Sequence, residues 1–175
     1  AIGLVSGYYR KVDAVIMRFM DGLMAFPSLI LALALIAVLG ASVQNVIIVI
    51  TIVSVPLVAR VVRASVLSLR EQQFIDAAKA LGVPDWRILM LHIAPNTLAV
   101  LMVQGTFVFA LAVIAEANLS FLGAGVPPTT PSWGNIMGQG RTYLPLAFWI
   151  TFFPGVFLSL TVLAINLLGD GLRDA

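Results

Sequence analysis

Residues able to carry chemistry are few in this chain, and their types limit what it can do. The 175 residues include one histidine, His92, and no cysteine, which excludes disulfides, thiolate chemistry and a histidine-based metal site. The sequence contains no phosphate-binding loop of the Walker type and no nucleophile paired with a base. It therefore predicts no catalytic residues, no metal site and no cofactor bound by this chain.

Three polar side chains stand out within long apolar stretches: Gln104, Glu116 and Asn118. Polar groups in a membrane segment are costly, and a functional hypothesis is the default for them. Gln104 either makes an interhelical hydrogen bond or lines a translocation path. Glu116, with Asn118 beside it, either reaches headgroups and water or contacts a ligand or a second subunit. Both interpretations stay open at each position.

A further segment is patterned for contact and not for a reaction. Over residues 72–81 an apolar stripe recurs at i, i+3, i+4 and i+7, which predicts a short amphipathic helix whose stripe is Phe74, Ala77, Ala78 and Leu81. Asp76 and Lys79 are spaced to pair on it. Gly82 suits the left-handed residue that ends a helix, and Pro84 suits the start of another. So short a helix is marginal alone, so it must lie against lipid, its own bundle or a docking partner.

The surrounding composition predicts a membrane protein. The chain is 61% hydrophobic and 10% charged with a mean hydropathy of +1.05, beyond what the surface of a soluble domain of this size can accommodate. Segments long enough to span are expected at about Leu23–Gly40, Val46–Val62, Thr97–Ala115 and Leu144–Leu168. Pro56 and Pro154 fall inside two of them and are compatible with kinked, packed helices. The expected fold is an all-α, polytopic membrane helical bundle.

Charge placement predicts the orientation. If the four spans alternate, nine of the ten Lys and Arg residues fall on one side, namely Arg10, Lys11, Arg18, Arg60, Arg63, Arg70, Lys79, Arg87 and Arg173. The positive-inside rule makes that side cytoplasmic, together with the short helix at residues 72–81 and the C-terminus. We expect the line of Arg60, Arg63 and Arg70 to anchor at the headgroups. A net charge of +2 gives no indication of a nucleic-acid partner.

The ends and the division of the chain complete the prediction. The opening "AIGLVSGYYRKVD" places apolar residues before charges, the reverse of a signal peptide, and resembles the end of a membrane helix. We expect a fragment cut at both ends, with four full spans and the end of a truncated one. With no internal repeat, residues 1–175 form a single expected membrane domain that contains a cytoplasmic loop at about 65–95.

The order of residues in that loop resembles the EAA loop of bacterial ABC importer permeases. Asp76-Ala77-Ala78 is followed by Gly82 and then by Pro95 at the spacing of that motif. Asp76 stands where Glu is usual, and Ala94 replaces the usual Leu before the proline. In that family the loop forms a coupling helix that docks in a cleft of the cytoplasmic ATPase. The resemblance implies this role for the residues Asp76, Ala77, Ala78, Leu81 and Gly82.

Other stretches extend the resemblance over nearly the whole chain. They are "MRFMDGLMAFPSLILALALIAVLG", "HIAPN", "EANLSFLGAGVPPTTPSWGNIM" and "LLGDGLRDA", and they look like the second permease subunit of the dipeptide, oligopeptide and nickel branch. The resemblance implies a type I ABC importer permease fold in the bacterial inner membrane. It also implies cytoplasmic ATP-binding subunits that use ATP and Mg, a sister permease and an extracytoplasmic solute-binding protein.

Within that branch the resemblance implies uptake of di- or oligopeptides. Glu116 is then a candidate contact for a peptide's amino terminus or for the sister subunit. The Pro- and Gly-rich loop around Trp133 is either a stiff surface loop or a contact for the binding protein. An importer of nickel or another small solute is the alternative from the same branch. A secondary transporter or channel and a structural scaffold are alternatives from other classes; a secondary transporter is expected to place ionisable residues in mid-membrane, where none clearly falls.

Overall fold

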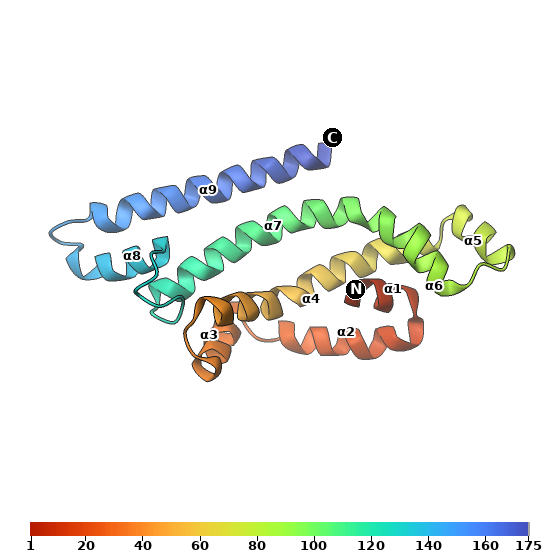
Figure 1. Ribbon diagram of the computed structural model, residues 1–175, viewed down its shortest axis with the longest axis horizontal. Coiled ribbons are helices and arrows are strands. Elements are labelled where there is room, and N and C mark those ends of the chain that lie inside the picture. Colours follow the sequence, from red (N-terminus) through yellow and green to blue (C-terminus); the bar gives the residue numbers. More distant parts are fainter. Residues whose placement is uncertain (175) are drawn as a thin grey trace. The chain divides into compact units, whose positions relative to one another are not determined.

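The computed structural model describes the backbone of residues 1–174 and the side chains of residues 1–171, and within that range the chain forms helices without a strand (Figure 1). The all-α prediction is confirmed. The helices are α1 (Ile2–Tyr8), α2 (Arg10–Met24), α3 (Ser28–Leu39), α4 (Val43–Arg70), α5 (Gln73–Ala80), α6 (Asp85–Arg87), the π-helix η1 (Ile88–Ile93), α7 (Ala94–Phe121), α8 (Trp133–Gly140), the 3₁₀ helix η2 (Arg141–Tyr143) and α9 (Trp149–Asp174).

These helices divide into two compact units. The first unit comprises Ala1–Ala25 and Val55–Gly105, and the second comprises Phe26–Ser54 and Thr106–Asp174. Helices α4 and α7 each contribute one part to each unit. The division leaves a single membrane domain over the whole chain as a prediction.

Three of the four predicted spans appear as continuous helices. Val43–Arg70, Asp85–Phe121 and Trp149–Gly171 are long and apolar enough to cross a membrane, and Pro56 and Pro154 lie inside the first and the last. The expected span at Leu23–Gly40 is wrong as one helix, because the chain breaks between α2 and α3 at Ala25–Pro27. Proline disfavours the helical conformation of the residue before it and removes an amide donor. The two pieces pass as a span only together.

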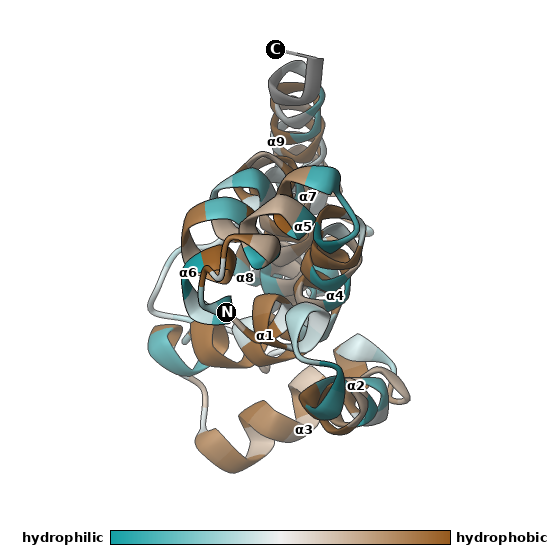
Figure 2. Ribbon diagram, turned by 90° about the vertical axis from the view of Figure 1, so that its right-hand side faces the viewer, coloured by the Kyte–Doolittle hydropathy of each residue, from teal (hydrophilic) through white to brown (hydrophobic). Residues whose placement is uncertain are grey.

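The segment before that break is the 15-residue helix α2. Hydrophilic and hydrophobic residues alternate around α2, whereas α3 is hydrophobic along its whole length (Figure 2). In the first unit, Met17 and Met20 of α2 are buried against Ala59 of α4. Val15 and Phe19 are exposed on α2. Its amphipathic pattern is typical of a helix with one packed and one free side.

Helix α1 packs on α4 through two glycines spaced four residues apart. A Cβ atom on Gly3 would stand 2.4 Å from the carbonyl oxygen of Ala59, and one on Gly7 would stand 2.7 Å from the Cβ of Val66. Neither distance is compatible with a side chain, so the backbone of α1 lies directly on α4. Such close contact through small residues is a common way for membrane helices to associate.

The basic residues of α4 in the first unit have protein partners, and headgroup anchoring of the same residues stays a prediction. The guanidinium of Arg63 donates to both carboxylate oxygens of Asp13, at 2.5 and 2.6 Å. Arg60 pairs with Asp21 at 2.7 Å. Arg70 donates to the carbonyl of Tyr8 at the end of α1, at 3.3 Å. A bidentate Arg–carboxylate pair fixes geometry as well as charge, so these residues tie α4 to α1 and α2.

A π-helical turn joins α6 to α7, and Pro95 follows it. Pro95 does not end the helix, because Asp85–Phe121 is one uninterrupted stretch. The amide of Ala94 donates to the carbonyl of Leu89, five residues back, and the side chain of Asn96 donates to the carbonyl of His92 at 2.5 Å. A wider turn moves carbonyls away from the proline ring that would otherwise strike one of them. The π turn therefore accommodates the proline.

Candidate functional site

The short helix α5 ends in a turn whose left-handed residue is Gly82. Gly82 has φ +74°, a left-handed conformation that other residues adopt at a cost. The amide of Gly82 donates to the carbonyl of Lys79 at 2.9 Å, and the amide of Val83 donates to the carbonyl of Ala78 at 3.1 Å. This pair of bonds is the Schellman motif. The predicted helix end at Gly82 is confirmed. Pro84 was predicted to start the next helix, and it occupies the N-cap of α6, one residue before that helix begins at Asp85.

The two sides of α5 face different surroundings. Ile75 and Ala78 are buried against Ile88, Leu89 and Ile93 in the main apolar cluster of the first unit. The other side of α5 is exposed: Phe74 is 45% exposed, Leu81 is 83% exposed, and Ala77 is exposed between them. The four residues of the predicted stripe therefore do not share one environment, since Ala78 faces the protein and the other three residues are exposed.

Charged groups on α5 are arranged as the spacing predicted. The ammonium of Lys79 lies 3.2 Å from Asp76, on a side of the helix where both groups are exposed. Such a pair is worth a few tenths of a kcal/mol. Asp76 is thus oriented by its own helix, beside the exposed residues Phe74, Ala77 and Leu81. We call these three residues the outward face of α5.

A buried phenol joins the start of α6 to α1. The hydroxyl of Tyr8 donates to a carboxylate oxygen of Asp85 at 2.7 Å. Tyr8 also belongs to the apolar cluster that holds Ile75 and Ala78. The turn after α5 is therefore fixed to α1 by a hydrogen bond and to α4 by packing. Figure 1 shows α5 folded back beside α6.

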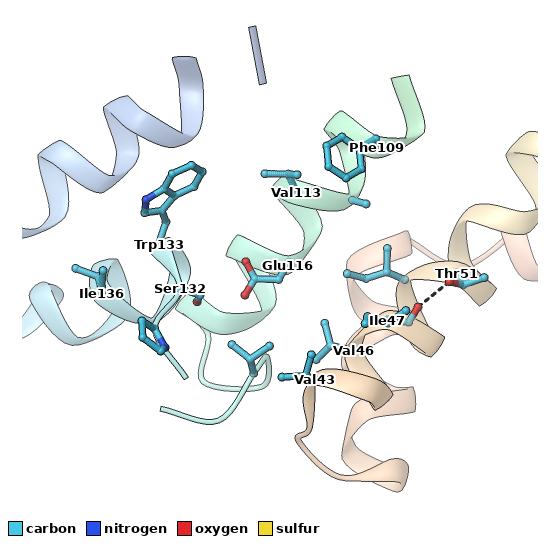
Figure 3. A pocket seen from close by; sticks show the side chains of 14 residues that line it. Val43, Val46, Ile47, Thr51, Phe109, Val113, Glu116, Ser132, Trp133 and Ile136 are labelled. Atoms are coloured by element: carbon cyan, nitrogen blue, oxygen red, sulfur yellow. Dashed lines mark hydrogen bonds between the residues drawn. The ribbon is translucent and has the colours of Figure 1, made fainter. Parts of the chain in front are cut away.

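A separate feature lies within the second unit, where α4, α7 and the start of α8 line an open cavity of about 630 Å³ (Figure 3). Apolar residues form most of its wall, including Val46 and Ile47 of α4 and Val113 of α7. Glu116 of α7 and Trp133 of α8 also line it. Figure 3 shows the carboxylate of Glu116 pointing from α7 toward the segment that carries Ser132 and Trp133. The volume falls in the range of ligand pockets.

The wall that carries Trp133 is held by two polar side chains. The Asn135 amide nitrogen donates to the carbonyls of Val126, Pro127 and Thr130 at 3.0–3.2 Å, and Asn135 is 7% exposed. Ser120 donates to Glu116 at 2.6 Å and accepts from the amide of Val126 at 3.2 Å. Buried amides and hydroxyls with satisfied bonds make a loop rigid. This loop therefore places Trp133 in a defined position.

The predicted site residues fall into separate places. Asp76, Ala77, Ala78, Leu81 and Gly82 lie together on or just after α5. Glu116 and Trp133 line one cavity, whereas Asn118 is exposed and is not among the residues that line it. Gln104 is half-buried in the first unit. Within the described part of the chain no group of three His, Asp or Glu side chains could hold a metal ion.

Sequence reasoning missed three residues that position these features: Tyr8, Ile75 and Asn135. Ile75 and Ala78 are spaced i, i+3 and so form a second apolar face on α5. Ala78 also belongs to the stripe that begins at Phe74, so the sequence alone did not separate the two faces. The Gly3 and Gly7 pair indicated a close helix contact. Neither the Tyr8–Asp85 bond nor the three carbonyls around Asn135 has a local sequence signal, because each partner set is formed by folding.

Comparison with known proteins gives the family. The whole chain, residues 1–175, matches the family described as "Binding-protein-dependent transport system inner membrane component". It is 53% identical over 173 residues to a putative peptide transport system permease protein of Brucella suis. It is 47% identical to a dipeptide transport system permease protein of Alkalihalophilus pseudofirmus and 41% identical to a glutathione transport system permease protein of Pectobacterium atrosepticum.

Each alignment covers 99% of this chain and 58% of the relative, so the chain spans little more than half the length of the curated relatives it matches. The match to the family nevertheless covers every residue, including α5 and the cavity. The chain therefore belongs to the family of binding-protein-dependent transport system inner membrane components.

Proposed function

We propose that this chain is part of the transmembrane permease of an ATP-driven importer of di- or oligopeptides. Membership of the family and the peptide transport names of two relatives support the proposal. The side of the membrane that carries α5 and the C-terminus is cytoplasmic, since the basic residues gather there. The permease carries no ATP site of its own, and a separate ATPase subunit uses ATP and Mg.

The outward face of α5 carries this proposal. A short helix with Phe74, Ala77 and Leu81 exposed leaves apolar area uncovered, although its opposite side is already packed on its own unit. Internal packing therefore accounts for Ile75 and Ala78 but not for the outward face. Ala77 has a small side chain and is exposed, so another protein surface can approach the backbone of α5 closely there. The partner is the cytoplasmic ATPase.

The contacts that hold α5 in place support a role for this helix in transmitting motion. Ile75 and Ala78 share a cluster with Val62 and Val66 of α4, and the Tyr8–Asp85 bond holds the following turn. A displacement of α5 is therefore transmitted to the part of α4 in the first unit. ATP binding draws the two ATPase subunits together and moves this helix and that of a sister permease. ATP binding in this way shifts the equilibrium between two conformations of the helix bundle, and hydrolysis with product release restores the starting conformation.

A solute-binding protein is the third partner. It delivers the peptide on the extracytoplasmic side, where the rigid loop before α8 presents Trp133. Trp133 is 36% exposed, and aromatic residues of this kind are common where a membrane protein meets the interface or a partner.

The test uses two neighbouring residues of α5 that differ in exposure. A cysteine is introduced by Ala77→Cys or by Ala78→Cys in the full-length permease within its assembled complex, and each is labelled with a benzophenone maleimide. The exposed position should cross-link to the ATPase subunit with a yield that changes when ATP is added. The buried position, 8% exposed, serves as the matched control and should label and cross-link poorly.

Three results would overturn all or part of the proposal. If both positions fail to cross-link in a complex that still takes up peptide, the outward face of α5 is not the ATPase contact. If purified complex in vesicles accumulates Ni²⁺ and not peptide, the substrate class is wrong while the ATPase contact stands. Peptide uptake by the permease without any ATPase would instead support a secondary transporter.

A further inference from the structure

The cavity of the second unit has one ionisable group in an otherwise neutral wall. Among the described residues that line it, Glu116 alone carries a charge, and most of the others are aliphatic or aromatic. The carboxylate receives one hydrogen bond, from Ser120 at 2.6 Å. It takes part in none of the ion pairs formed by the described residues.

Among the described side chains of the second unit, Arg141 is the only Lys or Arg, and it makes its own contact with an aromatic ring. The guanidinium of Arg141 in η2 lies 5.8 Å from the ring centre of Phe121, in a cation–π contact. A carboxylate in an apolar wall is costly unless a cation and further hydrogen bonds satisfy it. Intramembrane ionisable residues that face a cavity typically mark a substrate path. Glu116 therefore lacks its counter-charge within the described part of the second unit.

The shape and lining of the cavity limit what can supply that charge. Val46 and Val113 offer aliphatic surface near Glu116, and Trp133 offers a flat aromatic surface. A ligand with one cationic group and an apolar body matches this wall. A metal ion is a poor match, since one carboxylate and the hydroxyls of Thr51 and Ser132 are fewer oxygen ligands than a hard cation takes. The lining contains no Lys or Arg, so a ligand carboxylate has no partner there.

We propose that this cavity binds the amino-terminal end of a short peptide, with its ammonium group on the carboxylate of Glu116 and its first apolar side chain against Val46, Val113 and Trp133. This inference rests on the proposed peptide transport and assigns it a binding subsite. The ammonium group also has donors left for backbone or water. Because the carboxyl end is not recognised in the cavity, the subsite accepts peptides of different lengths.

The test uses accessibility of a cysteine placed in the wall. Val113→Cys is introduced into a cysteine-free full-length permease in its assembled complex, and its reaction with a methanethiosulfonate reagent is timed. The probes are leucyl-leucine amide, which has an ammonium group and no carboxylate, and its N-acetyl derivative, which has no charge. Ala112→Cys lines the same cavity and provides a second reporter if the first variant fails to assemble.

Leucyl-leucine amide should slow the labelling, and the N-acetyl derivative should need an about tenfold or higher concentration for the same effect. Glu116→Gln should remove that difference between the probes. Glu71→Gln makes the same chemical change at an exposed position far along the sequence, in the turn after α4, and should leave the difference intact. Equal protection by both probes, or none by either, would overturn the subsite.

Two other outcomes would assign the cavity to a different occupant and would also overturn the proposal. Slow labelling without any probe in phosphatidylethanolamine membranes, but not in phosphatidylcholine membranes, would indicate a lipid ammonium group. Slow labelling in the complex but not in the isolated permease would indicate a protein segment. Peptide uptake by the same preparation is measured in parallel, so failed uptake refutes the proposed function and failed protection refutes only the subsite.

Discussion

Replacing Gly82 separates backbone conformation from packing in the loop after α5. A Cβ atom at Gly82 would meet no other atom within 4 Å, so an alanine there makes no clash, and its cost comes from φ +74°. A left-handed conformation costs an L-residue about 1–2 kcal/mol. The smaller entropy of alanine in the unfolded chain returns about 0.4–1 kcal/mol. We therefore expect Gly82→Ala to weaken the turn by about 1 kcal/mol.

Hydrogen exchange of the full-length permease in detergent measures this loss locally. The amides of Gly82 and Val83 are protected by their bonds to Lys79 and Ala78, and a loss of about 1 kcal/mol should make their exchange about fivefold faster. Gly82→Asn should cost much less, because asparagine tolerates the left-handed region.

Replacing a second glycine, Gly22, should change stability in the opposite direction. Gly22 lies inside α2 with open space around it, so Gly22→Ala should stabilise that helix by about 0.5–1 kcal/mol and leave the exchange at Val83 unchanged. If Gly82→Asn speeds exchange as much as Gly82→Ala does, the left-handed conformation is not what holds the turn, and the reasoning fails.

Three further outcomes follow from the packing and the ion pairs. Gly7→Ala should lower the thermal midpoint of the full-length permease by overpacking α1 against α4, at a cost of about 1–3 kcal/mol; an unchanged midpoint would mean that the two helices do not touch there. Asn135→Asp replaces a three-carbonyl donor by acceptors and should destabilise by about 1–3 kcal/mol, while the same change at exposed Asn118 should be neutral in the same melting assay. Asp13 lies ahead of the apolar segment, and the hydrogen bond from Arg63 holds the pKa of its carboxyl below the usual range. The ion pair therefore stabilises the fold fully above the ordinary aspartate pKa, and this stabilisation is lost as pH falls through the lowered pKa. The stability gap between wild type and Asp13→Asn should then shrink on acidification, and a gap independent of pH would contradict the pairing.

Features carried by local pattern could be predicted from the sequence. Long apolar runs predict α4, α7 and α9 because a bilayer requires their length, whatever the neighbours are. The helix end at Gly82 and the pair Asp76–Lys79 depend on a few adjacent residues, and both are confirmed. The composition of the cavity could not be predicted, because Glu116 and Trp133 are brought together only by the fold.

Where two local patterns compete, tertiary contacts decide. Phe74 and Ile75 are both apolar, and helical spacing allows either to lead the buried side of α5; contact with Ile88 and Ile93 selects Ile75. Arg63 looks like an interfacial anchor until Asp13, fifty residues earlier, is placed beside it. Pro95 is a helix breaker by rule, yet the π turn before it keeps the helix continuous.

That π turn has a consequence for comparing and recombining these permeases. A π-helical turn holds one more residue than an α-helical turn of the same connection, so deleting one residue within Ile88–Ile93 would restore α-helical pairing. A π turn rotates the chain less per residue than an α turn does, so the six π residues turn it about as far as five α residues would. The extra residue therefore leaves the outward face of α5 pointing in nearly the same direction as an α-helical connection that lacks it. Alignments and chimeras of these permeases should therefore allow a one-residue gap within Ile88–Ile93, where a regular α-helical turn can replace the π turn.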